Sequence, residues 1–169
     1  RRIVDALIVD GRVAPAVVAG PSSIVRSQVE RGASWRALDL DHFIDETLAR
    51  LDGLVVIDET KIIVSGHSGA GCSLTGGMVT TPDSKRRLHG ILSIDTCMIP
   101  AVGAKLGAAH PRTHVAVGYQ DISWSRSFSA FHTAFERAAA EQERPAEVLR
   151  TVTKLAPKRD FHNQTVPLS

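Results

Sequence analysis

The sequence has few cysteines, no long hydrophobic run and no excess of charge of one sign. Its two cysteines, Cys72 and Cys97, are too few for a disulfide framework, and their spacing matches no zinc motif, so we expect both to be small buried apolar residues. The longest apolar runs, such as 16–19 and 54–57, stop far below the roughly 20 residues that cross a bilayer, so no membrane span is predicted. With 20 Lys+Arg against 18 Asp+Glu, scattered rather than clustered, the charge pattern argues against nucleic acid as a partner.

The chain also lacks an initiator methionine and a charged-then-apolar leader after Arg1. We therefore expect a processed form, or a chain whose true start is missing, and the sequence indicates no compartment. Hydrophobic residues make up 43% and charged residues 22%, as is typical of folded soluble domains. The length suits one domain, and no repeat or linker divides it, so we expect a single domain over residues 1–169.

Hydrophobic periodicity predicts alternating helices and strands. Apolar residues at helical spacing predict helices over residues 2–10, 39–51 and 125–141, with Gly11 ending the first. Short β-rich runs predict strands over residues 16–19, 61–65, 90–94, 114–118 and 147–154, the last at a partly exposed edge. Five strands separated by helical or loop segments imply parallel βαβ units, so we expect a three-layer α/β domain with right-handed crossovers. In such sheets, functional sites form at the carboxyl ends of the strands.

The most informative motif follows the strand predicted over residues 61–65. Residues 66–71 read Gly-His-Ser-Gly-Ala-Gly and contain the nucleophile-elbow pattern G-x-S-x-G with alanine in the last position, followed by a stretch able to be helical. An elbow holds its serine on a strained strand-to-helix turn, where small neighbours avoid clashes. We expect Ser68 to be the nucleophile and the backbone N–H of Gly69 to be one oxyanion-hole donor. A glycine-rich turn without chemistry is the alternative reading.

A serine hydroxyl is a weak nucleophile unless a base takes its proton, so the motif needs a histidine held by a carboxylate. The order Ser, Asp, His is expected for this kind of fold. Asp121 follows the strand over 114–118, and His162 follows the last predicted strand, so both come where the order requires them. Asp121 would orient the imidazole, and His162 would act as general base and then as general acid.

Other residues compete for these roles or support them. Asp95 ends the strand over 90–94 and either supplies the carboxylate or caps the following turn. Asp160, two residues before His162, fits a solvated loop charge better. His67 shapes the elbow but is not expected to be the base, and Trp124, three residues after Asp121, is the better of the two tryptophans for lining an acyl or aromatic pocket.

Taken together, these segments resemble the α/β-hydrolase superfamily, and within it the esterase branch of esterase D, feruloyl, acetyl and enterochelin esterases. Residues 10–18 look like the helix end, Gly, Pro and apolar strand that precede the elbow in that branch. Residues 66–71 are similar to its elbow, 117–121 to its acid-bearing turn and 162–163 to its histidine loop. The resemblance implies a triad of Ser68, Asp121 and His162, with Gly69 as an oxyanion donor.

The sequence departs from this branch at its front. The first strands of the branch, and the loop carrying the second oxyanion-hole N–H, have no counterpart here, so we expect an N-terminally truncated α/β-hydrolase-like sheet. The implied activity is a serine hydrolase that cleaves carboxylic esters through an acyl-enzyme, with a small-molecule ester as its substrate and no metal or organic cofactor. The alternatives are an acyltransferase of the same fold, cleavage of a peptide or amide, and a non-catalytic α/β-hydrolase-like module that binds a ligand or partner.

Overall fold

The computed structural model describes residues 2–21, 35, 38–71, 75–120 and 128–155. Its α-helices and strands are α1 (Arg2–Val9), α2 (Leu40–Leu51), β1 (Ile63–His67), β2 (Gly90–Ile94), α3 (Pro100–Gly107), β3 (His114–Tyr119), α5 (Phe128–Ala140) and β4 (Arg150–Lys154). Short 3₁₀ helices are η2 (Glu59–Lys61), η3 (Ser68–Gly71), η4 (Gly77–Val79) and η5 (Thr81–Asp83).

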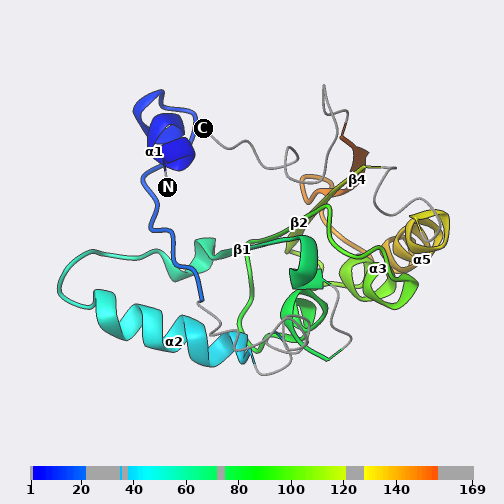
Figure 1. Cartoon of the computed structure of the whole chain (residues 1–169), viewed down its shortest axis with the longest axis horizontal. Helices are drawn as coiled ribbons and strands as arrows, with labels where there is room; N and C mark the ends of the chain where they lie inside the picture. The colour runs from blue at the N-terminus through cyan, green and yellow to red at the C-terminus, as the bar shows by residue number, and fades with distance from the viewer. Residues whose placement is uncertain (1, 22–34, 36–37, 72–74, 121–127, 156–169) are drawn as a thin grey trace.

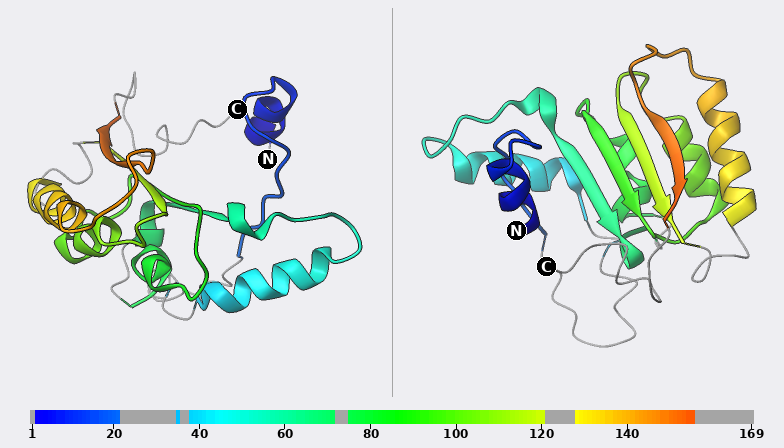
Figure 2. Two further views of the ribbon diagram at one scale, coloured as in Figure 1. Left: turned by 180° about the vertical axis from the view of Figure 1, so that it is seen from behind. Right: turned by 90° about the horizontal axis from the view of Figure 1, so that it is seen from above.

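The four strands form one parallel sheet in the order β1-β2-β3-β4 (Figures 1 and 2). The chain thus adds each strand beside the previous one, with α3 connecting β2 to β3 and α5 lying between β3 and β4 in the sequence. An α/β class with a parallel sheet is therefore confirmed. Because all strands run the same way, the carboxyl ends of β1, β2 and β3 lie at one edge of the sheet.

Most of the predicted elements are present. The helices expected over residues 2–10, 39–51 and 125–141 correspond to α1, α2 and α5, and four of the five expected strands correspond to β1–β4. Gly11 does end α1: it has a φ of +68°, its N–H donates to the Ile8 carbonyl at 3.0 Å, and the N–H of Arg12 donates to the Leu7 carbonyl at 2.9 Å. These two bonds form the Schellman motif that a left-handed glycine permits.

The buried strand predicted over residues 16–19 is wrong. These residues have no regular structure and are exposed, with Val18 62% accessible. Four apolar residues between Pro15 and Pro21 satisfy the composition of a strand, but a strand also needs a neighbour for its backbone hydrogen bonds. The described part of the chain supplies no such neighbour, so the apolar run stays irregular and exposed to solvent.

One face of the sheet is covered by α3 and α5, which pack against each other (Figures 1 and 2). Glycines on α3 permit this close approach: a Cβ at Gly103 would lie 2.5 Å from the Phe131 carbonyl oxygen, and one at Gly107 would lie 2.4 Å from that of Phe135. Both phenylalanines are buried in the core formed with β2, β3 and the apolar side of α2. The helices are thus held on the sheet by a continuous apolar layer.

The opposite face of the sheet carries a different set of side chains. Register places Ile63, Ser65 and Thr151 on this face, and all three are exposed, Ile63 to 61%. Helix α1 lies apart from the strands (Figures 1 and 2). Over the residues that the structure describes, packed helices therefore cover one face of the sheet, and the second helical layer of the expected three-layer arrangement is not among them.

Two expectations about cysteine and membranes can also be compared with the structure. Cys97 is half-buried and disulfide-bonded, so its interpretation as a free buried apolar residue is wrong. The only other cysteine of the sequence, Cys72, lies outside the described residues. Within the described ranges, no helix has the length and apolar character required to cross a bilayer.

Candidate active site

The predicted nucleophile lies at the end of the first strand of the sheet. Strand β1 continues through Gly66 and His67, two residues further than predicted, and Ser68 directly follows it. Ser68 has a φ of +55°, a left-handed conformation that costs a non-glycine residue roughly 1–2 kcal/mol. A half-buried serine held in this conformation at the carboxyl end of a parallel strand is the geometry expected of a nucleophile elbow.

Small residues around Ser68 are required by close packing. A Cβ at Gly66 would lie 2.4 Å from the Met78 side chain and 3.1 Å from the Ala70 Cβ. A Cβ at Gly71 would lie 2.5 Å from the Thr96 Cβ. The turn therefore packs against η4 on one side and against the segment after β2 on the other, which explains the spacing of the two glycines. The alanine at position 70 is tolerated because the second close approach is made one residue later, at Gly71.

Gly69 has a different environment from its neighbours. A Cβ there would meet no atom within 4 Å, so its lack of a side chain is not required by packing. Gly69 lies in the first turn of η3, where backbone N–H groups have no acceptor within the helix. Its N–H can therefore serve as the expected oxyanion donor.

The α-helix expected after the turn is not found in the described residues. Instead, η3 is four residues long, and beyond residues 72–74 the chain continues through η4 and η5. Gly77 at φ +65°, together with Pro82, breaks the helical continuation. Among the described residues, the backbone N–H groups next to Ser68 therefore belong to a short 3₁₀ helix and not to an α-helix.

Asp95 occupies the corresponding place on the neighbouring strand. Register pairs His67 with Ile94, so Ser68 and Asp95 are the next residues on two strands whose axes lie about 4.8 Å apart. Asp95 has a φ of +45°, and it is the only non-glycine residue besides Ser68 with a positive φ among those described. Two adjacent strands thus end in the same unusual conformation, both at residues with chemically useful side chains.

The Asp95 carboxylate is fully buried and accepts hydrogen bonds from Gln120, which directly follows β3. Its Oδ1 accepts the backbone N–H of Gln120 at 3.2 Å, and its Oδ2 accepts the Gln120 side-chain amide at 3.0 Å. The backbone N–H of Asp95 donates to the Gly118 carbonyl at 2.7 Å. Asp95 therefore fixes the chain just before residue 121, a role beyond the catalytic acid or turn cap that its place after a strand predicts.

Several predicted site residues cannot be placed. Asp121, Trp124, Asp160 and His162 lie outside the described residues. The residues on either side of the 121–127 segment are in contact, since the rings of Tyr119 and Phe128 stack with centroids 3.5 Å apart. His67, which is described, is half-buried and lies on the sheet face opposite to the Gly66 side of β1.

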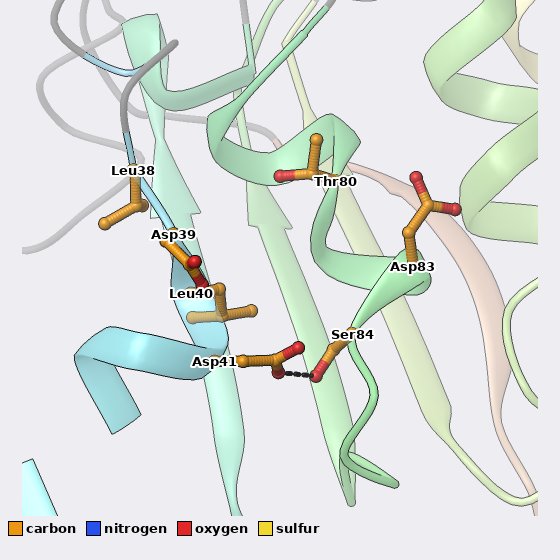
Figure 3. A pocket seen from close by; sticks show the side chains of 7 residues that line it. All are labelled: Leu38, Asp39, Leu40, Asp41, Thr80, Asp83 and Ser84. Atoms are coloured by element: carbon orange, nitrogen blue, oxygen red, sulfur yellow. Dashed lines mark hydrogen bonds between the residues drawn. The ribbon is translucent and has the colours of Figure 1, made fainter. Parts of the chain in front are cut away.

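A separate acidic hollow of about 360 Å³ lies where the start of α2 faces η5 (Figure 3). Its carboxylates already have partners: Asp39 caps α2 by accepting the His42 N–H, and Asp83 pairs with Lys105. Asp41 accepts from Ser84 and the Lys85 N–H; burial raises its pKa, but these hydrogen bonds and the nearby cations outweigh burial and leave it below the ordinary value. No group of residues suited to a metal ion occurs within the described ranges, and no residue of the elbow lines this hollow.

The chain was compared with family models, with curated proteins and with solved structures, and none of them matches it. The functional assignment therefore depends on the site itself.

Proposed function

We propose that the chain is a serine hydrolase that cleaves a carboxylic ester of a small molecule through an acyl-enzyme. The observation that carries this proposal is the left-handed Ser68, held between β1 and η3 at the carboxyl edge of a parallel sheet. The packing of Gly66 and Gly71 supports it, because the turn is built to hold this conformation. We also propose that the enzyme is an esterase and that its fold is of the α/β-hydrolase type.

In the proposed reaction, Ser68 Oγ attacks the ester carbonyl while His162 takes its proton. The developing oxyanion accepts a hydrogen bond from the backbone N–H of Gly69. A donor of this kind stabilises the transition state by about 3 kcal/mol. His162 then returns the proton to the departing alcohol, which leaves the acyl group on Ser68. Water then attacks the acyl-enzyme with the same proton transfers through His162 and releases the acid. Asp121 orients the imidazole in both steps.

Asp95 and Gln120 support this scheme by fixing the chain from which Asp121 follows. Both oxygens of the buried Asp95 carboxylate accept from Gln120, so the end of β3 is tied to the end of β2, one strand away from Ser68. The proposal therefore assigns Asp95 as a positioning residue and Asp121 as the residue that contacts the histidine.

The proposal predicts burst kinetics with an activated ester. With 4-nitrophenyl acetate in excess, we expect a rapid release of about one nitrophenolate per chain, followed by a slower steady state, because acylation of Ser68 precedes a slower hydrolysis. Stopped-flow absorbance measures the burst amplitude against protein concentration.

The matched control is Ser65→Ala, which removes an exposed serine from the same strand and should leave the burst unchanged. Release that is linear from the first time point, at the rate of buffer alone, would contradict an acyl-enzyme and favour a non-catalytic binding module.

A further inference from the structure

A second hollow, of about 280 Å³, lies at the opposite edge of the sheet from Ser68, where the strands begin. It is lined by residues that lead into all four strands: Thr60 before β1, Arg87 and His89 before β2, Arg112 and His114 at the start of β3, and Glu147 before β4. Its floor includes the buried apolar side chains of Leu88 and Val148. The volume is close to the lower limit of small-molecule pockets.

Two arginines of this hollow have no ion-pair partner among the described residues. Over the described residues, the ion pairs of the structure do not include Arg87 or Arg112, although the adjacent Arg86 pairs with both Asp45 and Glu59. The lining therefore includes two arginines and one carboxylate, that of Glu147, and has an excess of positive charge. Guanidinium groups without protein partners favour oxyanions, to which they donate two parallel hydrogen bonds.

The histidines add oriented donors. The rings of His89 and His114 lie with centroids 5.0 Å apart at an angle of 50°. His114 Nδ1 accepts the backbone N–H of Leu149 at 3.2 Å, so in the neutral ring the proton is on Nε2, which is then a donor. His114 can thus donate a hydrogen bond to an anion from Nε2.

The surrounding backbone keeps the hollow in shape. The N–H of His114 donates to the His89 carbonyl at 2.9 Å, and that of His89 donates to the Ile62 carbonyl at 2.8 Å. Behind it, Arg150 donates to the carbonyls of Ala109 and His110 at 2.8 and 2.9 Å. Burial, and then repulsion from Arg144, lowers the pKa of Arg150 to about 10, which still leaves the group charged at neutral pH and adds to the positive potential.

We infer that this hollow binds a phosphate group, with Arg87 and Arg112 as its charge partners and His114 as a hydrogen-bond donor. Glu147 limits the affinity, because its carboxylate repels the same anion. The inference is independent of the proposed hydrolase activity, since the hollow and Ser68 lie at opposite ends of the strands.

The test is a titration with inorganic phosphate at about 0.01 M ionic strength, where salt screens electrostatic attraction only weakly. The readout is the change in the NMR chemical shifts of the His89 and His114 ring protons. We expect saturable shifts, an affinity reduced about five- to tenfold in Arg112→Gln, and no saturation in Arg87→Gln/Arg112→Gln. Glu147→Gln is expected to bind more tightly. Arg12→Gln, which removes an exposed cation near α1, is the control for net charge and should bind like the parent chain.

Phenyl phosphate distinguishes the source of the phosphate group. Tighter binding than inorganic phosphate would indicate a phosphomonoester whose organic part contacts the apolar floor, and equal binding would indicate the free ion. Ser68→Ala should bind phosphate normally, which separates this site from the hydrolase proposal. The absence of saturable shifts in the parent chain, or equal weakening in Arg12→Gln and Arg112→Gln, would overturn the inference.

Discussion

Replacing Gly71 with alanine is expected to destabilise the fold by about 3 kcal/mol, which lowers the melting temperature by roughly 6–12 °C for a chain of this size. The new Cβ would lie 2.5 Å from the Cβ and 2.7 Å from the Oγ1 of Thr96. Thr96 cannot retreat easily, because it is fully buried and its hydroxyl is hydrogen-bonded to that of Ser93 at 2.8 Å. Thermal unfolding followed by circular dichroism measures the change.

Gly69→Ala is the matched control for this substitution. It adds the same methyl group two residues earlier, where the new Cβ meets no atom within 4 Å, so its melting temperature should stay within about 2 °C of the parent value. If the two variants unfolded at the same temperature, the close packing between η3 and the segment after β2 would not hold the elbow as described.

Asp121→Asn is expected to reduce the rate of Ser68 acylation by about 10⁴-fold, the scale seen when a triad acid is neutralised. Asp95→Asn should reduce it by about 10- to 100-fold, because it loosens the end of β3, from which Asp121 follows. Asparagine suits the second test, since it keeps the volume of Asp95 and tolerates the φ of +45°. The substitution replaces one of the two carboxylate oxygens that accept hydrogen bonds from Gln120 by an amide nitrogen.

The readout is the acylation rate by stopped flow, together with thermal unfolding. Asp95→Asn leaves a buried donor poorly satisfied, so a loss of about 1–3 kcal/mol in stability should accompany its slower acylation. Gln120→Ala combined with Asp95→Asn should be less damaging than the sum of the two single changes, because both remove the same contact. A 10⁴-fold loss in Asp95→Asn, with Asp121→Asn near the parent rate, would make Asp95 the catalytic acid instead.

The parts of the fold that the sequence predicted are those with a strong local pattern. The apolar stripe of α2, with Leu40, Ile44 and Leu48, is visible in the sequence and packs on the core as expected. The turn after β1 was also predictable, because the glycine-rich run of residues 66–71 directly follows a β-branched run. The contacts that require Gly66 and Gly71 were not, since they are made with Met78 and Thr96, 12 and 25 residues further along the chain.

Helix α3 was not among the helices predicted from the sequence. It begins with Pro100, and Val102 and Leu106 are fully buried at helical spacing. Gly103 and Gly107 look like helix breakers in the sequence, yet their role is to let α5 approach closely. Only the partner helix explains them, so no reading of residues 100–107 alone could separate a helix from a loop.

Long-range partners explain the other differences. Asp95 and Gln120 are 25 residues apart, and their double hydrogen bond depends on β2 and β3 being neighbours. Cys97 was expected to be a free apolar residue, but a disulfide depends on which residues the fold brings close, not on local composition. The failed strand over residues 16–19 is the converse case, a suitable composition without a neighbouring strand.

Reaction with a fluorophosphonate probe, followed by measurement of the intact mass, shows whether Ser68 is an activated nucleophile. We expect a single adduct on the parent chain, retained in Ser65→Ala and lost in both Ser68→Ala and His162→Ala. No adduct on the parent chain, or an adduct that persists in Ser68→Ala, would contradict the proposed role of Ser68.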